Sequence, residues 1–292
     1  MFSVTKTKKY WFTISGALVL TSIIMLFSWG LNFGIDFTGG SLTEISYEAS
    51  PSSEESIRQI FTDNGFSNIV LQKTDKGAII RFSEASEEVH QKIKGNLAGS
   101  LGESFEEVRF ESIGPSIGQE LRNKTELAIA AALLAITIYI AFAFRKVSRP
   151  VASWKYGIAA IVALFHDVII TAGLFSFLGK FYGVEVDAPF IAAILTVLGY
   201  SVNDTIVVFD RIRENLHKGH SLFEETVDGS VRQTFARSLN TSLTVILSLL
   251  AVYLFGGESV RAFSLALIVG VIVGTYSSIF LASPLVTLWQ KQ

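Results

Sequence analysis

The chain has 292 residues, of which 50% are hydrophobic and 17% are charged, and it contains no cysteine. This composition is too apolar for an ordinary soluble domain, and the missing thiols exclude disulfides, thiol catalysis and thiolate metal sites. The net charge of -2 at pH 7 says little about partners, because the basic residues are grouped in particular segments.

Six apolar stretches are long enough to cross a bilayer, because about 30 Å of hydrocarbon corresponds to roughly 20 helical residues. In chain order they are 11–31, 127–144, the segments between Lys155 and Lys180 and between Asp187 and Asp210, the segment from Arg237 to Glu258, and 262–290. We therefore predict an α-helical polytopic membrane protein with six transmembrane helices. No small-residue cleavage site follows the first span, so we expect an uncleaved anchor.

Lysine and arginine near the span ends predict the orientation, because short basic loops are translocated poorly. Basic residues gather before the first span, between the second and third, and between the fourth and fifth: Lys6, Lys8, Lys9, Arg145, Lys146, Arg149, Lys155, Arg211, Arg213, Lys218, Arg232 and Arg237. We expect these segments and both termini to be cytoplasmic. The domain 33–122 is then extracytoplasmic. It separates residues 1–32, which contain the first span, from residues 123–292, which contain the other five.

Short periodic patterns within 33–122 predict a water-soluble domain. Strands are expected at 42–47, 68–73, 77–82 and 105–113, with one helix around Ile57, Ile60 and Phe61 and another along Val89, Ile93, Leu97 and Leu101. The order strand, helix, strand, strand, helix, strand indicates a small α+β ferredoxin-like fold. The domain shows no catalytic pattern, and its single histidine, His90, is expected on a helix surface. We expect it to bind a partner or a substrate chain.

Asp204 is the clearest candidate for chemistry, because an ionisable side chain inside a bilayer is costly, rare and usually functional. It lies in the fourth span, about three quarters of the way across. Its neighbours make the helix polar and small enough to admit water or a close helix: Gly199, Tyr200, Ser201, Asn203 and Thr205. We predict a carboxyl that takes up and releases a proton, and the alternative is a capped acid near the helix end.

Two further groups in the spans leave alternatives open. Arg237 begins the fifth span, before the polar residues Ser238, Asn240, Thr241, Ser242 and Thr244. It is either the cation that pairs with Asp204 or a cytoplasmic anchor whose side chain snorkels to the interface. Asp167, beside His166 in the third span, serves either as a second relay group or as a hydrogen-bond partner of a neighbouring helix.

Two features lie next to the spans. Asp36 follows the first span in a run that ends with Gly39 and Gly40, where glycines permit tight turns. It is either part of a mouth or hinge or merely part of a connecting turn, and the turn is favoured. The segment 211–237 carries an apolar stripe among charges, which predicts an amphipathic helix in the cytoplasmic membrane interface. The stripe consists of Leu222, Phe223, Val227, Val231 and Phe235.

Four motifs together resemble the SecF family, membrane subunits of the bacterial Sec protein-export machinery within the RND superfamily. They are 33–40 (FGIDFTGG), 113–118 (IGPSIG), 166–171 (HDVIIT) and 199–215 (GYSVNDTIVVFDRIREN). The last is the most specific, and the resemblance covers nearly the whole chain.

The resemblance implies a function in the bacterial plasma membrane. Members pair with SecD, whose six spans are related to theirs by a pseudo-two-fold axis, and the pair uses the proton gradient to assist late steps of preprotein translocation. It implies that Asp204 is the relay aspartate and Arg237 its partner, while another relay aspartate belongs to SecD. The implied partners are SecD, the SecYEG translocon, the translocating preprotein and membrane lipids. We expect no nucleic-acid partner, cofactor, metal or catalytic residue.

Three other functions are compatible with intramembrane acids. An intramembrane aspartyl protease needs Tyr-Asp and Gly-x-Gly-Asp motifs, and neither occurs in the sequence. A small-molecule or lipid efflux pump of the RND type usually has two six-span halves and larger loops. A scaffold subunit would use its acids only to hold helices together. We expect a protein-export subunit that is not an enzyme.

Overall fold

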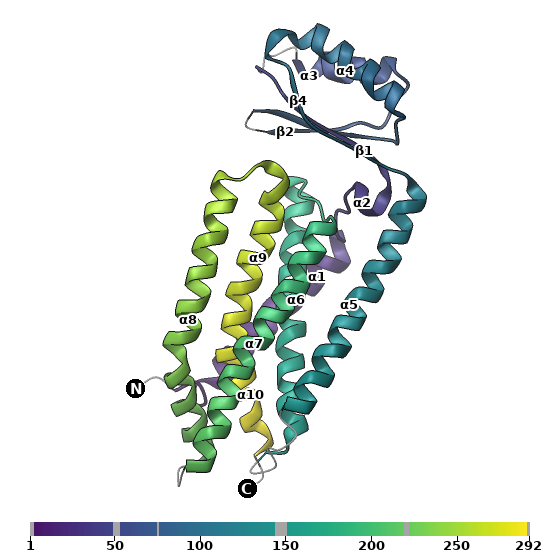
Figure 1. The fold of residues 1–292 in the computed structure, drawn as a ribbon. Coiled ribbons are helices and arrows are strands. Elements are labelled where there is room, and N and C mark those ends of the chain that lie inside the picture. The colour runs from purple at the N-terminus through teal and green to yellow at the C-terminus, as the bar shows by residue number, and fades with distance from the viewer. Residues whose placement is uncertain (1–2, 49–52, 75, 144–150, 219–221, 291–292) are drawn as a thin grey trace. The chain divides into compact units, whose positions relative to one another are not determined.

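The computed structural model describes residues 3–48, 53–74, 76–143, 151–218 and 222–290 (Figure 1). Contacts group the chain into two compact units, Met1–Asn32 with Leu127–Gln292, and Phe33–Glu126. We call the first the membrane unit and the second the small domain, and each is described by itself. Three basic residues used for the orientation, Arg145, Lys146 and Arg149, lie outside the described ranges.

Six helices among the described residues are long and apolar enough to cross a membrane, which confirms the predicted number. They are α1 (Lys8–Trp29), α5 (Pro115–Ala143), α6 (Ser153–Tyr182), α7 (Ala188–Lys218), α8 (Phe223–Phe255) and α9 (Glu258–Ser277). The chain after α9 continues directly through η2 (Ser278–Ala282), α10 (Ser283–Leu285) and η3 (Val286–Trp289), which complete the sixth span. The 22 residues of α1 extend about 33 Å, enough for the hydrocarbon core.

Two helices continue beyond their predicted ends and form a hairpin. α7 runs past Asp210 to Lys218, and α8 begins at Phe223. The hairpin is held by polar contacts: Arg211 Nε donates to Gln233 Oε1 at 2.6 Å, and Asn215 Nδ2 donates to Ser230 Oγ at 2.8 Å. The segment 211–237 is therefore divided between two long helices and is no separate amphipathic element.

The apolar stripe of that segment faces protein and does not form the expected membrane-surface helix. Phe223, Val227 and Val231 are buried in the core of the membrane unit, whereas Leu222 and Phe235 are exposed. An apolar stripe at helical spacing fits both environments, because a lipid interface and a neighbouring helix cover the same face. The extended hairpin decides between them, since it brings α7 against these side chains.

The small domain has the predicted order of strands and helices. Its elements are α2 (Ile35–Thr38), β1 (Gly40–Ser46), α3 (Ser53–Asp63), β2 (Val70–Thr74), β3 (Gly77–Phe82), α4 (Glu87–Leu101), η1 (Gly102–Ser104) and β4 (Glu106–Ile113). The strands pair in the order β2-β3-β1-β4, every pair antiparallel. Helices α3 and α4 cover one face of the sheet (Figure 1), and Ile45, Phe61 and Ile80 belong to the core between them.

Gly39 and Gly40 occupy a crossing that no larger residue fits. Both have positive φ, 74° and 122°. A Cβ at Gly39 would lie 2.8 Å from Pro115 Cα, and one at Gly40 would lie 2.8 Å from the Phe82 carbonyl oxygen. Side chains are excluded there by backbone conformation and by space. The pair therefore lets the chain enter β1 directly beside the start of α5.

His90 is buried, contrary to the expected surface position. Its ring stacks on Phe110 with centroids 3.6 Å apart, and Nε2 lies 2.6 Å from Glu107 Oε1. Lys94 Nζ lies 2.6 Å from the other carboxylate oxygen of Glu107. Burial raises the pKa of the Glu107 carboxyl, but the hydrogen bonds from Lys94 and His90 outweigh burial and hold that pKa below its ordinary value.

Glu107→Gln is expected to destabilise the small domain by about 1 kcal/mol at neutral pH, because charge-assisted hydrogen bonds are lost. A carboxyl whose pKa is lowered by folding stabilises above its unfolded pKa, and that stability is lost as the pH falls through the folded pKa. The difference from the parent chain should therefore shrink below about pH 4. Hydrogen exchange of β4 and α4 amides in the full chain measures it.

The control for this prediction is Glu88→Gln, which removes an exposed carboxylate from α4, the helix that carries His90 and Lys94. It should leave exchange in β4 unchanged. An equal loss of protection in both variants would show that general charge, and not the buried contacts of Glu107, stabilises the domain.

Candidate functional site

The site lies where α9 packs against α6, α7 and α8. Two glycines bring α9 close to α7: a Cβ at Gly270 would lie 2.2 Å from Val197 Cγ2, and one at Gly274 would lie 3.0 Å from Ser201 Cβ. Their spacing of four residues is the small-x-x-x-small pattern of close helix pairs in membranes. Hydroxyl groups on α9 thereby reach acids on the neighbouring helices.

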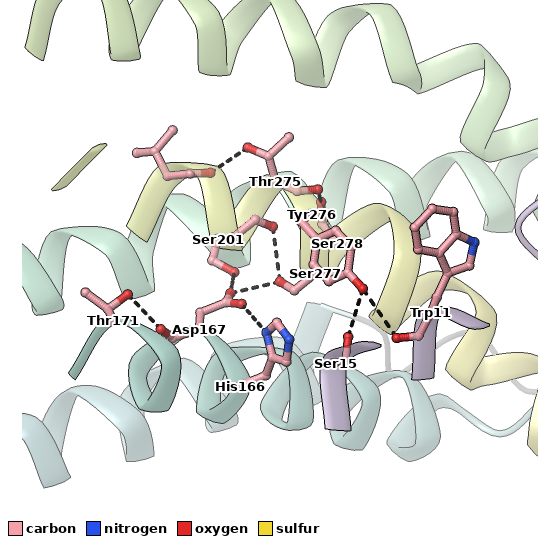
Figure 2. A network of polar contacts seen from close by, with 12 residues as sticks. Trp11, Ser15, His166, Asp167, Thr171, Ser201, Thr275, Tyr276, Ser277 and Ser278 are labelled. Atoms are coloured by element: carbon pink, nitrogen blue, oxygen red, sulfur yellow. Dashed lines mark hydrogen bonds and ion pairs between the residues drawn. The ribbon is translucent and has the colours of Figure 1, made fainter. Parts of the chain in front are cut away.

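Asp167 on α6 is fully buried and accepts hydrogen bonds from two other helices (Figure 2). Ser201 Oγ on α7 donates to Asp167 Oδ2 at 2.5 Å, and Ser277 Oγ on α9 donates to the same oxygen at 2.9 Å. The other carboxyl oxygen lies 2.9 Å from His166 Nδ1. The acid thus joins α6 to both α7 and α9.

Asp204 on α7 has an exposed fraction of 8% and is also held by serines. Ser238 Oγ on α8 donates to Asp204 Oδ1 at 2.5 Å, and Ser278 Oγ donates to Oδ2. The contacts of this carboxyl are thus with neutral hydroxyls. Among the described residues, no lysine or arginine lies within ion-pair distance of it. Such a group can gain or lose a proton without breaking an ion pair.

Of the two serines that contact Asp204, Ser278 begins an irregular turn of the sixth span. Ser278 is the first residue of η2, a π-helical turn, and Ser283 Oγ donates to the Ser278 carbonyl oxygen at 2.6 Å. Single π-helical turns in long helices occur frequently at functional sites. A further set of hydroxyl contacts joins α7, α8 and α9 nearby. Ser242 Oγ on α8 lies 2.5 Å from Thr275 Oγ1 on α9 and 2.8 Å from Tyr200 Oη on α7.

Arg237 lies on α8 beside Ser238, and its side chain is exposed. No ion pair between Arg237 and Asp204 is present among the described residues, although its charge acts on that carboxyl through space. Arg237 lines a cavity of about 350 Å³ between α7 and α8, together with Ile206, Val207, Asp210, Arg211, Glu214, Gln233 and Thr234. The cavity gives water a place beside the arginine.

Among the residues that the structure describes, only His166 of the other three candidates contacts one of the two buried acids. His166 contacts Asp167 and stacks on Tyr276 with centroids 5.9 Å apart, and its Nε2 is buried without a hydrogen-bond partner in the described part of the chain. Asn203 is exposed, whereas its neighbour Asp204 is buried. Asp36 lies in α2 of the small domain, so it does not belong to the cluster in the membrane unit.

Sequence reasoning missed Ser277 and Ser278. Both lie in an uncharged span that the sequence marks only as a long apolar run. The available signal was the run Thr275, Tyr276, Ser277 and Ser278, four consecutive hydroxyl side chains in a largely apolar helix. The described residues contain no group of three or more His, Cys, Asp or Glu that could hold a metal ion.

The fold and site together define a polytopic membrane protein whose buried acids lie at contacts between spanning helices. Comparison with protein families gives a more specific result. Residues 93–292 match the family model "Protein export membrane protein SecD/SecF, C-terminal", and residues 24–51 match the model "SecD/SecF GG Motif". The second match contains the Gly39–Gly40 crossing described above.

Curated relatives agree over nearly their full length. A protein translocase subunit SecF of Thermobaculum terrenum is 43% identical and covers 100% of this chain and 95% of its own. The SecF of Sebaldella termitidis is 40% identical, covering 98% and 91%. The chain therefore belongs to the SecD/SecF family of protein export membrane proteins, on the SecF side, and it is an accessory subunit of protein export.

Solved structures extend the likeness to the fold. The crystal structure of SecDF, a translocon-associated membrane protein from Thermus thermophilus, superposes with a TM-score of 0.86 at 35% identity. This chain is covered completely but spans only 39% of that longer chain. A SecDF structure in a super-membrane-facing form gives a TM-score of 0.69, again at 35% identity, with 99% and 38% covered.

Proposed function

We propose that this chain uses proton movement across the membrane to assist late, extracytoplasmic steps of preprotein export, together with a SecD-type partner. The observation that carries the proposal is Asp204, a buried carboxyl contacted by two serine hydroxyls on two other helical segments. Protonation removes the charge to which both hydroxyls donate. The contacts of α7 with α8 and η2 therefore depend on whether the carboxyl carries a proton.

The energy available is sufficient for such a change. One elementary charge that crosses 100 mV yields about 2.3 kcal/mol, which corresponds to a change of about 50-fold in an equilibrium between two arrangements. Charge-assisted hydrogen bonds to a carboxylate contribute a similar amount each. A single protonation at Asp204 is thus able to alter how the spanning helices pack.

A second chain is part of the proposal, because this chain corresponds to 39% of the solved SecDF. Asn203 faces outward on the helix that carries Asp204, and Arg237, Asn240 and Thr241 face outward on α8. Polar side chains are costly against lipid, so a protein partner is favoured at these faces. We place SecD there, with SecYEG and the moving preprotein as further partners and with lipids around the remaining apolar helices.

The proposed location is the bacterial plasma membrane. We propose that both termini are in the cytoplasm and the small domain is outside, since Lys6, Lys8 and Lys9 lie at the start of the first span and Arg211 and Arg213 lie toward the end of the fourth. We propose that the chain has no enzymatic activity, because the hydrogen bonds of the two buried acids among the described residues go to serines of neighbouring helices and, at Asp167, to the adjacent histidine.

Export from proteoliposomes tests the proposal. Vesicles contain the translocon and the SecD-type partner, with or without this chain, and hold a preprotein at a late stage. An imposed proton gradient should accelerate completion only when the chain is present, and a protonophore should remove the acceleration. A chain that accelerates export equally with and without a gradient would be a scaffold. If the gradient accelerates export equally in vesicles that lack this chain, the proposal is refuted.

A further inference from the structure

Two consecutive serines contact two different intramembrane acids. Ser277, the last residue of α9, donates to Asp167 on α6, and Ser278, the first residue of η2, donates to Asp204 on α7. All four side chains are buried. A displacement of this dipeptide at one acid therefore changes its position at the other, because a single peptide bond separates the two contacts.

A second connection between the acids runs along α7. Ser201, which donates to Asp167 at 2.5 Å, precedes Asp204 by three residues. Residues three apart lie on the same face of a helix. The two carboxyls are thus joined through α7 on one side and through the serine pair on the other, and the connected elements are α6, α7, α9 and η2. Figure 2 shows the contacts of Asp167 with Ser201 and Ser277.

Each serine of the pair has a second acceptor for its single hydroxyl hydrogen. Ser277 Oγ lies 3.1 Å from the Gly274 carbonyl oxygen, and Ser278 Oγ lies 3.1 Å from the Thr275 carbonyl oxygen. One hydroxyl can donate to the carboxylate or to its own helix, and a charged carboxylate is the stronger acceptor. Neutralising an acid favours the turn of its serine toward the backbone, which gives each contact two arrangements.

Asp167 also has a titratable partner of its own. His166 Nδ1 contacts its carboxyl at 2.9 Å, while the buried Nε2 has no hydrogen-bond partner among the described residues. Tyr276 on α9 is the titratable side chain that faces this pair, with its ring centroid 5.9 Å from that of His166, and no lysine or arginine of the described residues lies within ion-pair distance of Asp167. A carboxyl and an imidazole that share one short contact form a place where one proton can be held.

We propose that Asp167 and His166 form a second proton-binding site, and that Ser277 and Ser278 couple its occupancy to that of Asp204. This inference rests on the proposed function of Asp204. Each site takes up one proton from water and returns it to water, and the serines keep their own protons and only reorient. Because coupling between two sites is reciprocal, a change at either acid alters proton binding at the other.

Infrared spectra of the full chain, assembled with its SecD-type partner in vesicles, test the coupling. The carboxylic-acid band of Asp167 is identified by its loss in Asp167→Asn. Ser278→Ala, which removes a contact of Asp204 and none of Asp167, should change proton affinity at Asp167 by at least about fivefold. Asp204→Asn should do the same. The matched control is Ser264→Ala, because Ser264 Oγ is buried on α9 without a hydrogen-bond partner in the described part of the chain.

Reciprocity supplies a second measurement if Ser278→Ala fails to fold. Ser277→Ala then replaces it, and the band of Asp204 is followed. The inference would be overturned if the Asp167 band does not change with pH, or if its pH dependence is the same in the parent chain, in Ser278→Ala and in Asp204→Asn. The proposed function fails separately, when Asp204→Asn leaves gradient-dependent export intact. If Asp204→Asn abolishes gradient-dependent export but leaves the Asp167 band unchanged, only the coupling between the two sites is refuted.

Discussion

Asp204→Asn, in the chain assembled with its SecD-type partner, is expected to abolish the acceleration of export by a proton gradient. Asparagine has nearly the same shape as aspartate and still accepts a hydrogen bond at one oxygen, but it cannot gain or lose a proton. The expected loss is up to about 50-fold per 100 mV, the full effect of one charge. Export without a gradient should change little, because the packing around the residue is kept.

Asp210→Asn is the matched control. Asp210 lies on the same helix, nearer the predicted cytoplasmic end, and its exposed carboxylate pairs with Arg213 at 3.1 Å. Exposed ion pairs contribute little, so the variant should retain gradient-dependent export. If both variants lose it to the same degree, the effect would belong to the charge of α7 in general.

Arg237→Gln is expected to reduce gradient-dependent export by about tenfold. Arg237 is next to Ser238, which donates to Asp204, and its charge acts on that carboxyl through space, so its removal changes the electrostatic field at the carboxyl. A factor of ten corresponds to about 1.4 kcal/mol, a typical charge interaction at intermediate dielectric. Rates of proton uptake and of export in the same vesicles measure the effect.

Two further variants separate the role of charge from that of position. Arg237→Lys keeps the charge and should retain more activity than Arg237→Gln, although lysine lacks the planar fork of arginine. Arg232→Gln removes an exposed arginine from the same helix and should have no effect on gradient dependence. A large loss in Arg232→Gln, or none in Arg237→Gln, would contradict a specific role for Arg237.

The six spans and the strand order of the small domain were predictable because both depend on local patterns. A spanning helix needs an apolar run of fixed length, and the alternation of short periodic segments identifies a ferredoxin-like order. Helix ends were less predictable. α5 begins at Pro115, well before the apolar run, because polar residues continue a helix outside the hydrocarbon as readily as apolar ones inside it.

The two acids of the site were found from sequence because a charge within an apolar run is exceptional. The contacts of these acids could not be predicted from local sequence, because the residues that form them are far apart in the chain. Asp167 and Ser277 are separated by 110 positions, and Asp204 and Ser278 by 74. Serine is common in spanning helices, so the hydroxyl-rich run 275–278 does not by itself show which acids it contacts. His90 was misplaced for a related reason, because its partner Glu107 lies 17 residues away on β4.

Protonation of Asp204 during export is the most direct test of the account. In vesicles that hold the assembled complex, the infrared band of the protonated carboxyl is identified by its loss in Asp204→Asn and is followed while a proton gradient is imposed and a preprotein moves. We predict that the band grows and declines with the direction of the gradient. A band that stays constant while export responds to the gradient would contradict a relay at Asp204.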